Sequence, residues 1–316
     1  MDHITTLRHK PATLPALRFN PFTRGEIPEI SRMLSAGYSR TCDFTIGGIY
    51  LWEGYFMYSR AITGDTLFIK GVAEDNLSVP AFSLPVGAMP LSDSLPLLKA
   101  WCREAGVAPL LSAVPADRIN EIRAVADIES VTELPDWADY LYEIGPMTTF
   151  EGKKMVKKRN HVHRFAADHP DAVFEPLTPD NIPDALDFLE RHSALSPEKS
   201  VTADYDLIQT ADTLRHLDDY PFYGALLRVP DIGVVAFTVG EVLGDTLYVH
   251  IEKMDHEVNG SGETISSRFC GMMRSLYPGL RYVNREDSSG DPGLARAKEA
   301  YRPVALLHKY NVLLAP

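Results

Sequence analysis

An internal repeat constrains the fold of this chain more than any other feature of its sequence. Residues 19–23 read Phe-Asn-Pro-Phe-Thr and are followed three residues later by Ile-Pro, and residues 174–178 read Phe-Glu-Pro-Leu-Thr and are followed in the same way. The motif Gly-Asp-Thr-Leu then occurs at 64–67 and again at 244–247. Because the two matches keep their order, we interpret the chain as a duplication. Phe19 should then correspond to Phe174, and the turn at Asp65 to the turn at Asp245.

Each copy has a residue pattern in which strands and helices alternate. In the second copy we expect strands at 174–177, 225–228, 234–242, 246–252, 280–284 and 304–313, and helices at 182–191, 204–217, 264–276 and 292–300. In the first copy we expect strands near residue 19, on both sides of a turn at 63–65, at 108–114 and at 128–134, with helices at 27–35, 91–105 and 117–126. The predicted fold class is α/β (α+β), in which each copy forms a mixed twisted sheet flanked by helices.

The 316 residues are enough for two domains of ordinary size. We expect an N-terminal domain at 1–145, a basic linking helix at 146–170 and a C-terminal domain at 171–316.

Composition narrows the function classes. With 31 basic and 43 acidic residues the net charge is −12, so the surface repels nucleic acid and anionic lipid on average. No apolar run approaches the roughly 20 residues that a membrane helix needs, and the N-terminus lacks the apolar core of a signal peptide. The three cysteines are far apart and show no metal-binding spacing. We expect a cytoplasmic protein with no metal site, no DNA partner and no integral membrane segment.

One segment departs from this acidic character. Residues 151–165 contain six Lys or Arg residues and one Glu, and Thr148 with Glu151 forms a capping-box pattern before them. A helix is therefore predicted over residues 153–164, with Met155, Val162 and Phe165 as its apolar stripe. The basic residues of this helix could bind a polyphosphate or an RNA backbone. Alternatively, they form ion pairs with acidic residues of the same chain.

Two neighbouring segments of the second copy carry candidate chemistry. The strand period of two predicts that Tyr248, His250 and Glu252 share one face, where a carboxylate and an imidazole can hold and move a proton. The alternative is a plain polar sheet face. The loop Gly260-Ser261-Gly262 then opens a helix, and such a loop either cradles a phosphate or only makes a turn.

A strand bearing Glu252, followed by this glycine loop and a helix, resembles the core of the GNAT acetyltransferase superfamily. The loop pattern of that superfamily is Gln/Arg-x-x-Gly-x-Gly/Ala, and this chain carries Glu257 at its first position. The first copy has Leu-Pro-Val-Gly-Ala at 84–88 in the equivalent place, which makes it the degenerate partner and the second copy the active one.

A closer resemblance covers most of the chain. It is carried by His-Ile-Glu-Lys at 250–253, Asn-Arg-Glu-Asp at 284–287, Gly290, Gly-Leu at 293–294, Ala-Lys at 297–298, Tyr301-x-Pro303, and the segments 157–161, 164–165, 50–52 and 82–87. These motifs resemble an uncharacterised bacterial family that shares the C-terminal domain of phosphatidylglycerol lysyltransferases. The resemblance implies two tandem GNAT-like domains, related to the Fem peptidyltransferases.

The resemblance implies roles for individual residues. Glu252 would accept a proton from the acceptor amine with His250 assisting, and Tyr301 would protonate the leaving group. The donor's phosphates would lie at Gly260, Ser261 and Gly262 and near Lys298. The substrate would be bound by Tyr248, Asn284, Arg285, Glu286, Arg159 and Asn160. Arg285 can bind a carboxylate or a phosphate in a fork, or it can form an ion pair with a neighbouring acid.

Two functions remain open from the sequence. The first is a transferase that moves an acyl or aminoacyl group from an acyl-CoA, with coenzyme A as co-substrate, or from an aminoacyl-tRNA to a small-molecule amine or peptide. The second is a non-catalytic protein that keeps the fold and binds a small ligand between its halves.

Overall fold

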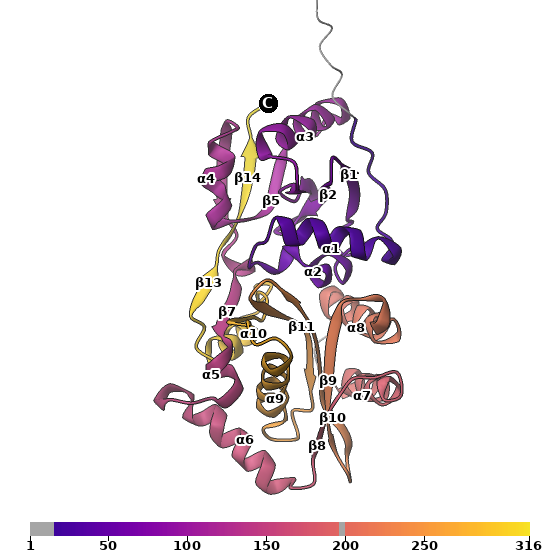
Figure 1. Cartoon of the computed structure of the whole chain (residues 1–316), viewed down its shortest axis with the longest axis vertical. Coiled ribbons are helices and arrows are strands. Elements are labelled where there is room, and N and C mark those ends of the chain that lie inside the picture. Colours follow the sequence, from indigo (N-terminus) through magenta and orange to yellow (C-terminus); the bar gives the residue numbers. More distant parts are fainter. Residues whose placement is uncertain (1–15, 196–199) are drawn as a thin grey trace, which may run out of the picture.

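The computed structural model describes residues 16–195 and 200–316, which form two seven-stranded mixed sheets, one above the other in Figure 1. The upper sheet has the order β1 (Ser59–Thr63), β2 (Thr66–Ala73), β3 (Asn76–Phe82), β5 (Leu110–Pro115), β14 (Lys309–Leu314) and β6 (Ile128–Glu133), with β4 (Val86–Gly87) paired to β2. Its helices are α1 (Ile27–Ala36), α2 (Ile46–Tyr50), α3 (Leu91–Ala105) and α4 (Ile119–Arg123).

The lower sheet has the order β13 (Ala305–Leu307), β7 (Asp139–Glu143), β12 (Tyr282–Asn284), β11 (Thr246–Met254), β10 (Gly233–Leu243), β9 (Phe222–Val229) and β8 (Val173–Pro176). Helix α9 (Ser261–Leu276) lies on one face, and α7 (Ile182–Leu195) and α8 (Val201–Arg215) lie on the other (Figure 1). Helices α5 (Ile144–Thr149), α6 (Val156–Asp168) and α10 (Pro292–Glu299) complete this half. Short 3₁₀ helices are η1 (Arg24–Glu26), η2 (Cys42–Phe44), η3 (Ala116–Arg118), η4 (Pro135–Trp137), η5 (Lys153–Met155) and η6 (Leu217–Asp219).

The two sheets repeat one strand order, which supports the duplication. Two antiparallel pairs in the upper sheet and three in the lower sheet, where β8 adds one, are followed by one parallel pair, β3 with β5 above and β11 with β12 below. Two further antiparallel pairs then complete each sheet. Phe19 lies beside Asn20, which bridges to Arg60 of β1, and Phe174 lies in β8, which pairs with β9. Both phenylalanines therefore stand at the same outer position, as predicted.

The prediction that the Asp65 and Asp245 turns are equivalent is wrong, because the two turns belong to different hairpins of their sheets. Asp65 lies between β1 and β2, the first hairpin of its sheet, whereas Asp245 lies between β10 and β11, the second hairpin. A short Gly-Asp turn recurs wherever a tight hairpin needs residues that accept positive φ, and Asp65 and Gly244 have φ values of 52° and 59°. The shared motif therefore reflects the same turn chemistry at two different places.

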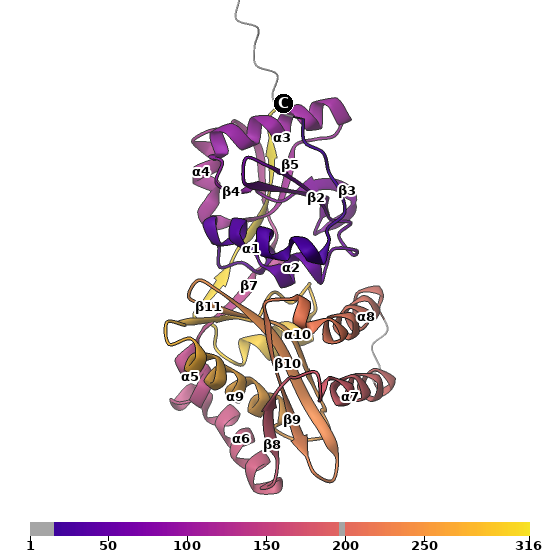
Figure 2. The same cartoon turned by 45° about the vertical axis from the view of Figure 1, so that its right-hand side comes forward.

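Each sheet receives one strand from the other half of the chain. Strand β14, from the C-terminus, lies between β5 and β6 of the upper sheet, and β7 lies between β12 and β13 of the lower sheet. Figure 2 shows the yellow C-terminal segment passing from the lower half into the upper one. Sheet membership thus departs at two strands from the ranges 1–145 and 171–316.

Most of the predicted elements are present, but the capping box is not. Thr148 lies inside α5, where its hydroxyl donates to the Ile144 carbonyl oxygen at 2.8 Å. Phe150, with φ of 50°, ends that helix, and α6 begins only at Val156. The hydroxyl bonds back to the preceding turn, so it cannot cap the next helix. Met155 and Phe165 are buried as predicted, and Val162 is half-buried.

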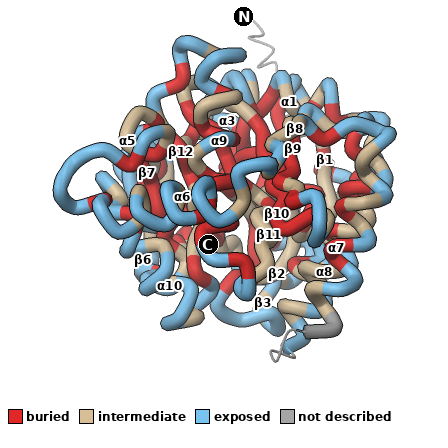
Figure 3. The backbone as a smooth tube through the Cα atoms, turned by 90° about the horizontal axis from the view of Figure 1, so that it is seen from below, coloured by how far each residue is buried: buried red, intermediate tan, exposed pale blue. Residues whose placement is uncertain are grey.

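The core is divided among three groups of apolar side chains, one around the upper sheet and one on each face of the lower sheet. Figure 3 shows the buried residues along the strands and the exposed ones on the outer sides of the helices. Within the described residues, no helix is long and apolar enough to cross a membrane.

Candidate functional site

The candidate site lies where two parallel strands of the lower sheet separate. Strands β11 and β12 pair at only three positions, ending with Tyr248 opposite Asn284. Beyond this point each strand carries charged side chains, among them Glu252 and Arg285. Clefts in α/β proteins commonly open at the carboxyl ends of parallel strands. We call Glu252, Arg285 and Tyr301 the strand-divergence site.

A β-bulge changes which side chains of β11 share a face. Val239 of β10 pairs with Ile251 and Gly240 pairs with Val249, so His250 is the extra residue on β11. Val249 then packs in the core on the α9 side, and Ile251 packs on the α7 and α8 side. The prediction that Tyr248, His250 and Glu252 share one face is therefore right for only two of them. The rings of Tyr248 and His250 stack with their centroids 6.4 Å apart, but the bulge places Glu252 on the α9 side, away from His250.

His250 is held between two carboxylates. Its Nδ1 lies 2.7 Å from Oε1 of Glu286 and its Nε2 lies 2.9 Å from Oε1 of Glu241, and the side chain is only 1% exposed. Burial alone would lower the pKa of His250, but the hydrogen bonds to Glu241 and Glu286 outweigh it and raise the pKa to about 9. Burial also raises the pKa of Glu286. Both ring nitrogens are engaged in this buried ion group.

The same ion group joins the two halves of the chain. The backbone N–H of Gly47, in α2, donates to Oε1 of Glu241 at 2.7 Å. A side chain at Gly47 would overlap the His250 ring. His250 therefore fixes how closely α2 approaches the lower sheet.

The strand-divergence site contains an incompletely satisfied cation. One arm of Arg285, Nη2, donates to Oε1 of Glu252 at 2.6 Å, with exposed fractions of 12% and 9% for the two side chains. The guanidinium carbon lies 4.5 Å from the centroid of the Tyr301 ring. The other arm, Nη1, is buried and makes no hydrogen bond of good geometry within the described part of the chain, although the Tyr301 side chain lies close enough to the guanidinium for a weak one.

The electrostatics of this site favour a permanent positive charge. Burial would lower the pKa of Arg285, but Glu252 outweighs it and the pKa is raised. Burial raises the pKa of Tyr301. The ammonium of Lys158 lies 3.8 Å from the same ring centroid, so Tyr301 contacts two cations.

Lys298 supports the loop that carries Arg285. Its ammonium donates to the carbonyl oxygen of Arg285 at 2.7 Å and to that of Asp287. Burial lowers its pKa. In this structure the Lys298 ammonium is therefore bound by the backbone of the loop that contains Arg285 and Asp287, and not by the glycine loop.

Asn284 and Tyr248 contact the N-terminal half. The Asn284 side-chain amide donates to the carbonyl oxygen of Arg40 and to Oδ2 of Asp139, each at 2.7 Å, and its oxygen accepts from the Glu286 N–H. The Tyr248 hydroxyl donates to the carbonyl oxygen of Ser39 at 2.8 Å. Both side chains are fully buried, and both hold the halves together in this structure.

The space next to the glycine loop 260–262 is occupied by α6 and by the side chain of Met254. A side chain at Gly260, whose φ is 84°, would overlap the His161 carbonyl oxygen of α6, and one at Gly262 would overlap the Met254 sulfur. Ser261 donates to the Asp255 carbonyl oxygen at 3.0 Å. The small residues therefore let α6 pack on the start of α9.

A carboxylate of the chain occupies the first turn of α9. Oε1 of Glu263 lies 3.0 Å from the ammonium of Lys158 and 3.1 Å from Nδ1 of His161, both on α6. Burial would raise the pKa of Glu263, but Lys158 and His161 outweigh it and lower the pKa. This ion pair fastens α6 beside the strand-divergence site.

The remaining predicted residues lie on α6. Arg159 donates to the carbonyl oxygen of Phe150 at 2.8 Å, and Asn160 is exposed. Neither contacts Arg285. Their neighbour Lys158 does reach Tyr301, and the sequence alone did not separate it from the other lysines.

A second group of buried charges, which we call the junction cluster, surrounds Lys309 of β14. Its ammonium lies 2.9 Å from Asp43, 2.8 Å from Asp139 and 3.5 Å from Asp287. Burial would lower the pKa of Lys309, but Asp139 and Asp43 outweigh it and raise the pKa. Burial and the neighbouring Asp43 raise the pKa of Glu74, which favours its neutral form.

The junction cluster also contains ligand-type atoms. Oxygens of Asp139 and Asp287 and the sulfur of Cys42 lie within 4.8 Å of one another. The ammonium of Lys309 stands 3.5 Å from that sulfur and beside both carboxylates. A side chain of the protein therefore supplies the positive charge that this group of acids needs.

The sequence reasoning missed Lys309, Glu241 and Glu263. Lys309 and Glu241 each interrupt a strongly apolar predicted strand, and an ionisable residue in such a strand is a signal for a buried ion pair.

The chain is similar in sequence and structure to proteins of one family. The family described as phosphatidylglycerol lysyltransferase, C-terminal, matches residues 37–313. The chain therefore belongs to this family, as its motifs indicated. No curated protein matches its sequence.

Several solved structures share the fold of this chain. A conserved protein of unknown function from Bacteroides thetaiotaomicron is 27% identical with a TM-score of 0.83, over 95% of this chain and 100% of that one. The C-terminal domain of a putative lysylphosphatidylglycerol synthetase from Agrobacterium fabrum is 14% identical with a TM-score of 0.60, over 93% of each chain. FemX is 9% identical with a TM-score of 0.59, over 95% of this chain and 98% of its own. The predicted fold class is thus confirmed, because the chain shares with these structures a mixed α/β fold of two sheets flanked by helices.

Proposed function

We propose that the chain is an aminoacyltransferase that moves an aminoacyl group from an aminoacyl-tRNA to an amine at the strand-divergence site. The observation that carries this proposal is the Arg285 guanidinium, which is buried where the strands separate, paired on one arm and unpartnered on the other. Preorganised donors of this kind stabilise an oxyanion well, because a dry site strengthens them and they need no reorganisation.

The reaction that this geometry suits is aminolysis of an ester. The acceptor nitrogen attacks the carbonyl carbon of the donor, and Nη1 of Arg285 donates to the carbonyl oxygen as it gains charge. Glu252 takes the proton that the nitrogen loses. The C–O bond to the donor breaks, and the leaving oxygen is protonated by Tyr301 or by water. Glu252 must first exchange its contact with Arg285 for one with the amine.

An aminoacyl donor is favoured over acyl-CoA by the contacts of the glycine loop. Gly260 and Gly262 are covered by α6 and Met254, and Glu263 places a negative charge in the first turn of α9. A pyrophosphate would meet a carboxylate there. The name of one similar structure, a putative lysylphosphatidylglycerol synthetase, also supports an aminoacyl group.

A second candidate is a non-catalytic protein that binds a small ligand between its halves. It is favoured by the ion pair that Glu252 forms and by the engagement of both His250 nitrogens. In that case Nη1 of Arg285 would bind a ligand oxygen without any reaction.

A ligand screen followed by one variant separates the two candidates. Thermal shifts with aminoacyl-tRNA, coenzyme A, acyl-CoAs and free amino acids identify the ligand, since a ligand at 100 times its Kd stabilises by about 2.7 kcal/mol. Glu252→Gln should then keep donor affinity while turnover falls by about 10²- to 10⁴-fold, and the exposed Glu257→Gln serves as the control. Full turnover in a folded Glu252→Gln protein would exclude Glu252 as the base. Ligand binding with no turnover of any acceptor would favour the binding protein.

A further inference from the structure

The loop 284–287, which follows β12, connects the strand-divergence site to the ion group of His250. Arg285 donates to Oε1 of Glu252 on the α9 side of β11. The next residue, Glu286, places its Oε1 at 2.7 Å from Nδ1 of His250. Two neighbouring residues of one loop therefore contact two residues of β11 that the bulge has separated. Neither contact can shift without moving the backbone that both share.

Glu286 holds this loop in a backbone conformation that its residue type disfavours. Its φ is 57°, in the left-handed region where a residue with a Cβ is strained. Its N–H donates to Oδ1 of Asn284 at 2.6 Å, and its carbonyl oxygen accepts from the Tyr140 N–H at 3.0 Å. A strained residue persists only where its surroundings fix it, so the side-chain contact with His250 is part of what holds the loop.

The direction of the Arg285 side chain depends on the loop. Its backbone N–H donates to the Tyr140 carbonyl oxygen at 3.1 Å, and its carbonyl oxygen accepts from the Lys298 ammonium at 2.7 Å. Nη1 makes no hydrogen bond of good geometry within residues 16–195 and 200–316, so the guanidinium does not fix this nitrogen by itself. A donor for an oxyanion must be held within about 0.5 Å of its productive place. The conformation of the loop therefore decides whether Nη1 can serve a ligand.

On its other side His250 connects the loop to α2 in the N-terminal half. Its Nε2 lies 2.9 Å from Oε1 of Glu241, and the same oxygen accepts from the Gly47 N–H at 2.7 Å. A Cβ added at Gly47 would stand 2.3 Å from Nε2 of the ring, so α2 cannot move toward the lower sheet without displacing His250. The His250 side chain is only 1% exposed, so water does not replace these contacts.

From these contacts we propose that His250 is a positioning residue for Arg285 and couples the position of α2 to the strand-divergence site. The path runs from Gly47 through Glu241, His250 and Glu286 to the backbone of Arg285. The proposal rests on the binding role proposed above for Nη1 of Arg285, and it holds for the transferase and for the binding protein alike. The N-terminal half thus regulates a site whose side chains all come from the C-terminal half.

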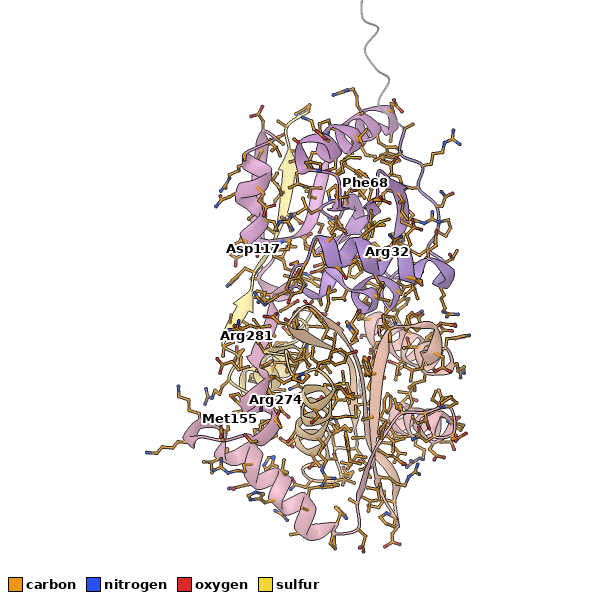
Figure 4. All side chains as sticks on the ribbon, in the orientation of Figure 1. Arg32, Phe68, Asp117, Met155, Arg274 and Arg281 are labelled. Atoms are coloured by element: carbon orange, nitrogen blue, oxygen red, sulfur yellow. The ribbon has the colours of Figure 1, made fainter. Side chains whose placement is uncertain are left out.

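The test observes Arg285 in the whole chain by NMR and needs no ligand. A guanidinium that is held in place gives separate Nη signals, whereas the exposed Arg32 of the upper half (Figure 4) serves as the reference for a freely rotating one. We expect His250→Gln to average the Nη signals of Arg285. Hydrogen exchange at the Arg285 and Glu286 amides should become about 10-fold faster, the usual effect of losing a charge-assisted hydrogen bond. The amide of Phe269, inside α9, reports general loss of stability and should change less.

Gly47→Ala applies the same test from the other half of the chain. Its Cβ displaces the His250 ring, so we expect the same averaging and faster exchange at Arg285, which Gly47 does not contact. Gly25→Ala, where an added Cβ meets nothing of the described chain within 4 Å, is the matched control and should leave Arg285 unchanged. Glu286→Gly is a further variant, because glycine accepts the φ of 57° and removes only the side-chain contact with His250. It should keep the fold and free Arg285.

Two results would overturn the proposal. The first is an Arg285 whose signals and exchange stay unchanged in the folded variants among His250→Gln, Gly47→Ala and Glu286→Gly. The second is an exchange rate that rises by the same factor at Arg285 and at Phe269, because His250 would then stabilise the fold without positioning Arg285. The measurement uses no donor or acceptor. Absence of transferase turnover would therefore leave it unaffected, and a failed coupling would leave the transferase proposal open to its own test.

Discussion

The junction cluster and the strand-divergence site are both built around a buried cation near loop 284–287, yet they differ in how fully that cation is compensated. Lys309 contacts three carboxylates. Arg285 contacts one carboxylate and an aromatic ring, and one of its nitrogens has no partner in the described chain. A buried cation that is surrounded by carboxylates holds a structure together, whereas a cation with an unpartnered nitrogen leaves a donor for a ligand. The comparison therefore indicates a structural role for Lys309 and supports the binding role that we propose for Arg285.

The largest effect is expected from Lys309→Met. The substitution leaves Asp43, Asp139 and Asp287 together without their cation, and breaking a buried pair in this way costs about 3–5 kcal/mol. Urea denaturation of the variant measures the loss. Lys154→Met, at an exposed lysine, is the control and should unfold like the parent chain. If the urea midpoint of Lys309→Met is unchanged, Lys309 does not stabilise the fold and the structural role inferred from its carboxylate contacts is wrong.

A smaller effect is expected from the buried ion group at His250, and it should depend on pH. The pKa of His250 is raised to about 9 from 6.5, so its stabilisation is fully present below pH 6.5 and is lost as the pH rises through 9. The contribution is at most about 3 kcal/mol. Denaturation of the parent chain and of His250→Gln should therefore converge between pH 6.5 and pH 9.5. A constant difference over that range would mean that His250 is not held charged.

Gly260→Ala should act on the strand-divergence site and leave the junction cluster intact. The added Cβ overlaps the His161 carbonyl oxygen, and φ at this position is 84°, so α6 must shift and take Lys158 away from Tyr301. We expect a loss of about 1–3 kcal/mol and a change in the environment of Tyr301, visible by NMR. Gly279→Ala, where an added Cβ meets nothing within 4 Å, should cost much less. Equal effects at both glycines would contradict the packing role of Gly260.

The smallest effect on stability is expected from the exposed residues of α6. Lys157→Gln and Asn160→Ala should change the unfolding free energy by less than about 0.5 kcal/mol. If α6 binds a polyanion, Lys157→Gln should weaken aminoacyl-tRNA binding and reduce its salt dependence by about one counter-ion. Donor binding that does not respond to salt would leave α6 with packing as its only role.

The sequence predicts local features of the fold well and non-local ones poorly. The hairpin of β10 and β11 follows from alternating apolar residues around Leu243, Gly244 and Asp245, and Pro28 marks the start of α1. The exchange of β7 and β14 has no such mark, because a strand pattern shows that a strand forms but not which partner it takes. The partner of Leu141 in β12, for example, is Asn284.

For the site, residue types were easier to predict than geometry. Arg285, Glu252 and Tyr301 do lie together, but the bulge at His250 moved Glu252 to the other face of β11. One extra residue in a strand leaves no trace in its composition, and it reverses every side chain beyond it. The sequence leaves open whether the glycine loop cradles a phosphate or only makes a turn, because the helix that covers it, α6, lies almost a hundred residues earlier in the chain.

The reciprocal exchange of β7 and β14 has a consequence for how the chain is made. Val114 of β5 pairs with Tyr310, so the upper sheet contains contacts between residues separated by most of the chain. Such a high contact order slows folding, because a long loop must close before these contacts form. During synthesis the N-terminal half leaves the ribosome with a gap between β5 and β6, and its exposed strand edges can pair with other chains until β14 has been made. Strand β14 therefore completes a sheet whose other strands all lie in the first half of the chain.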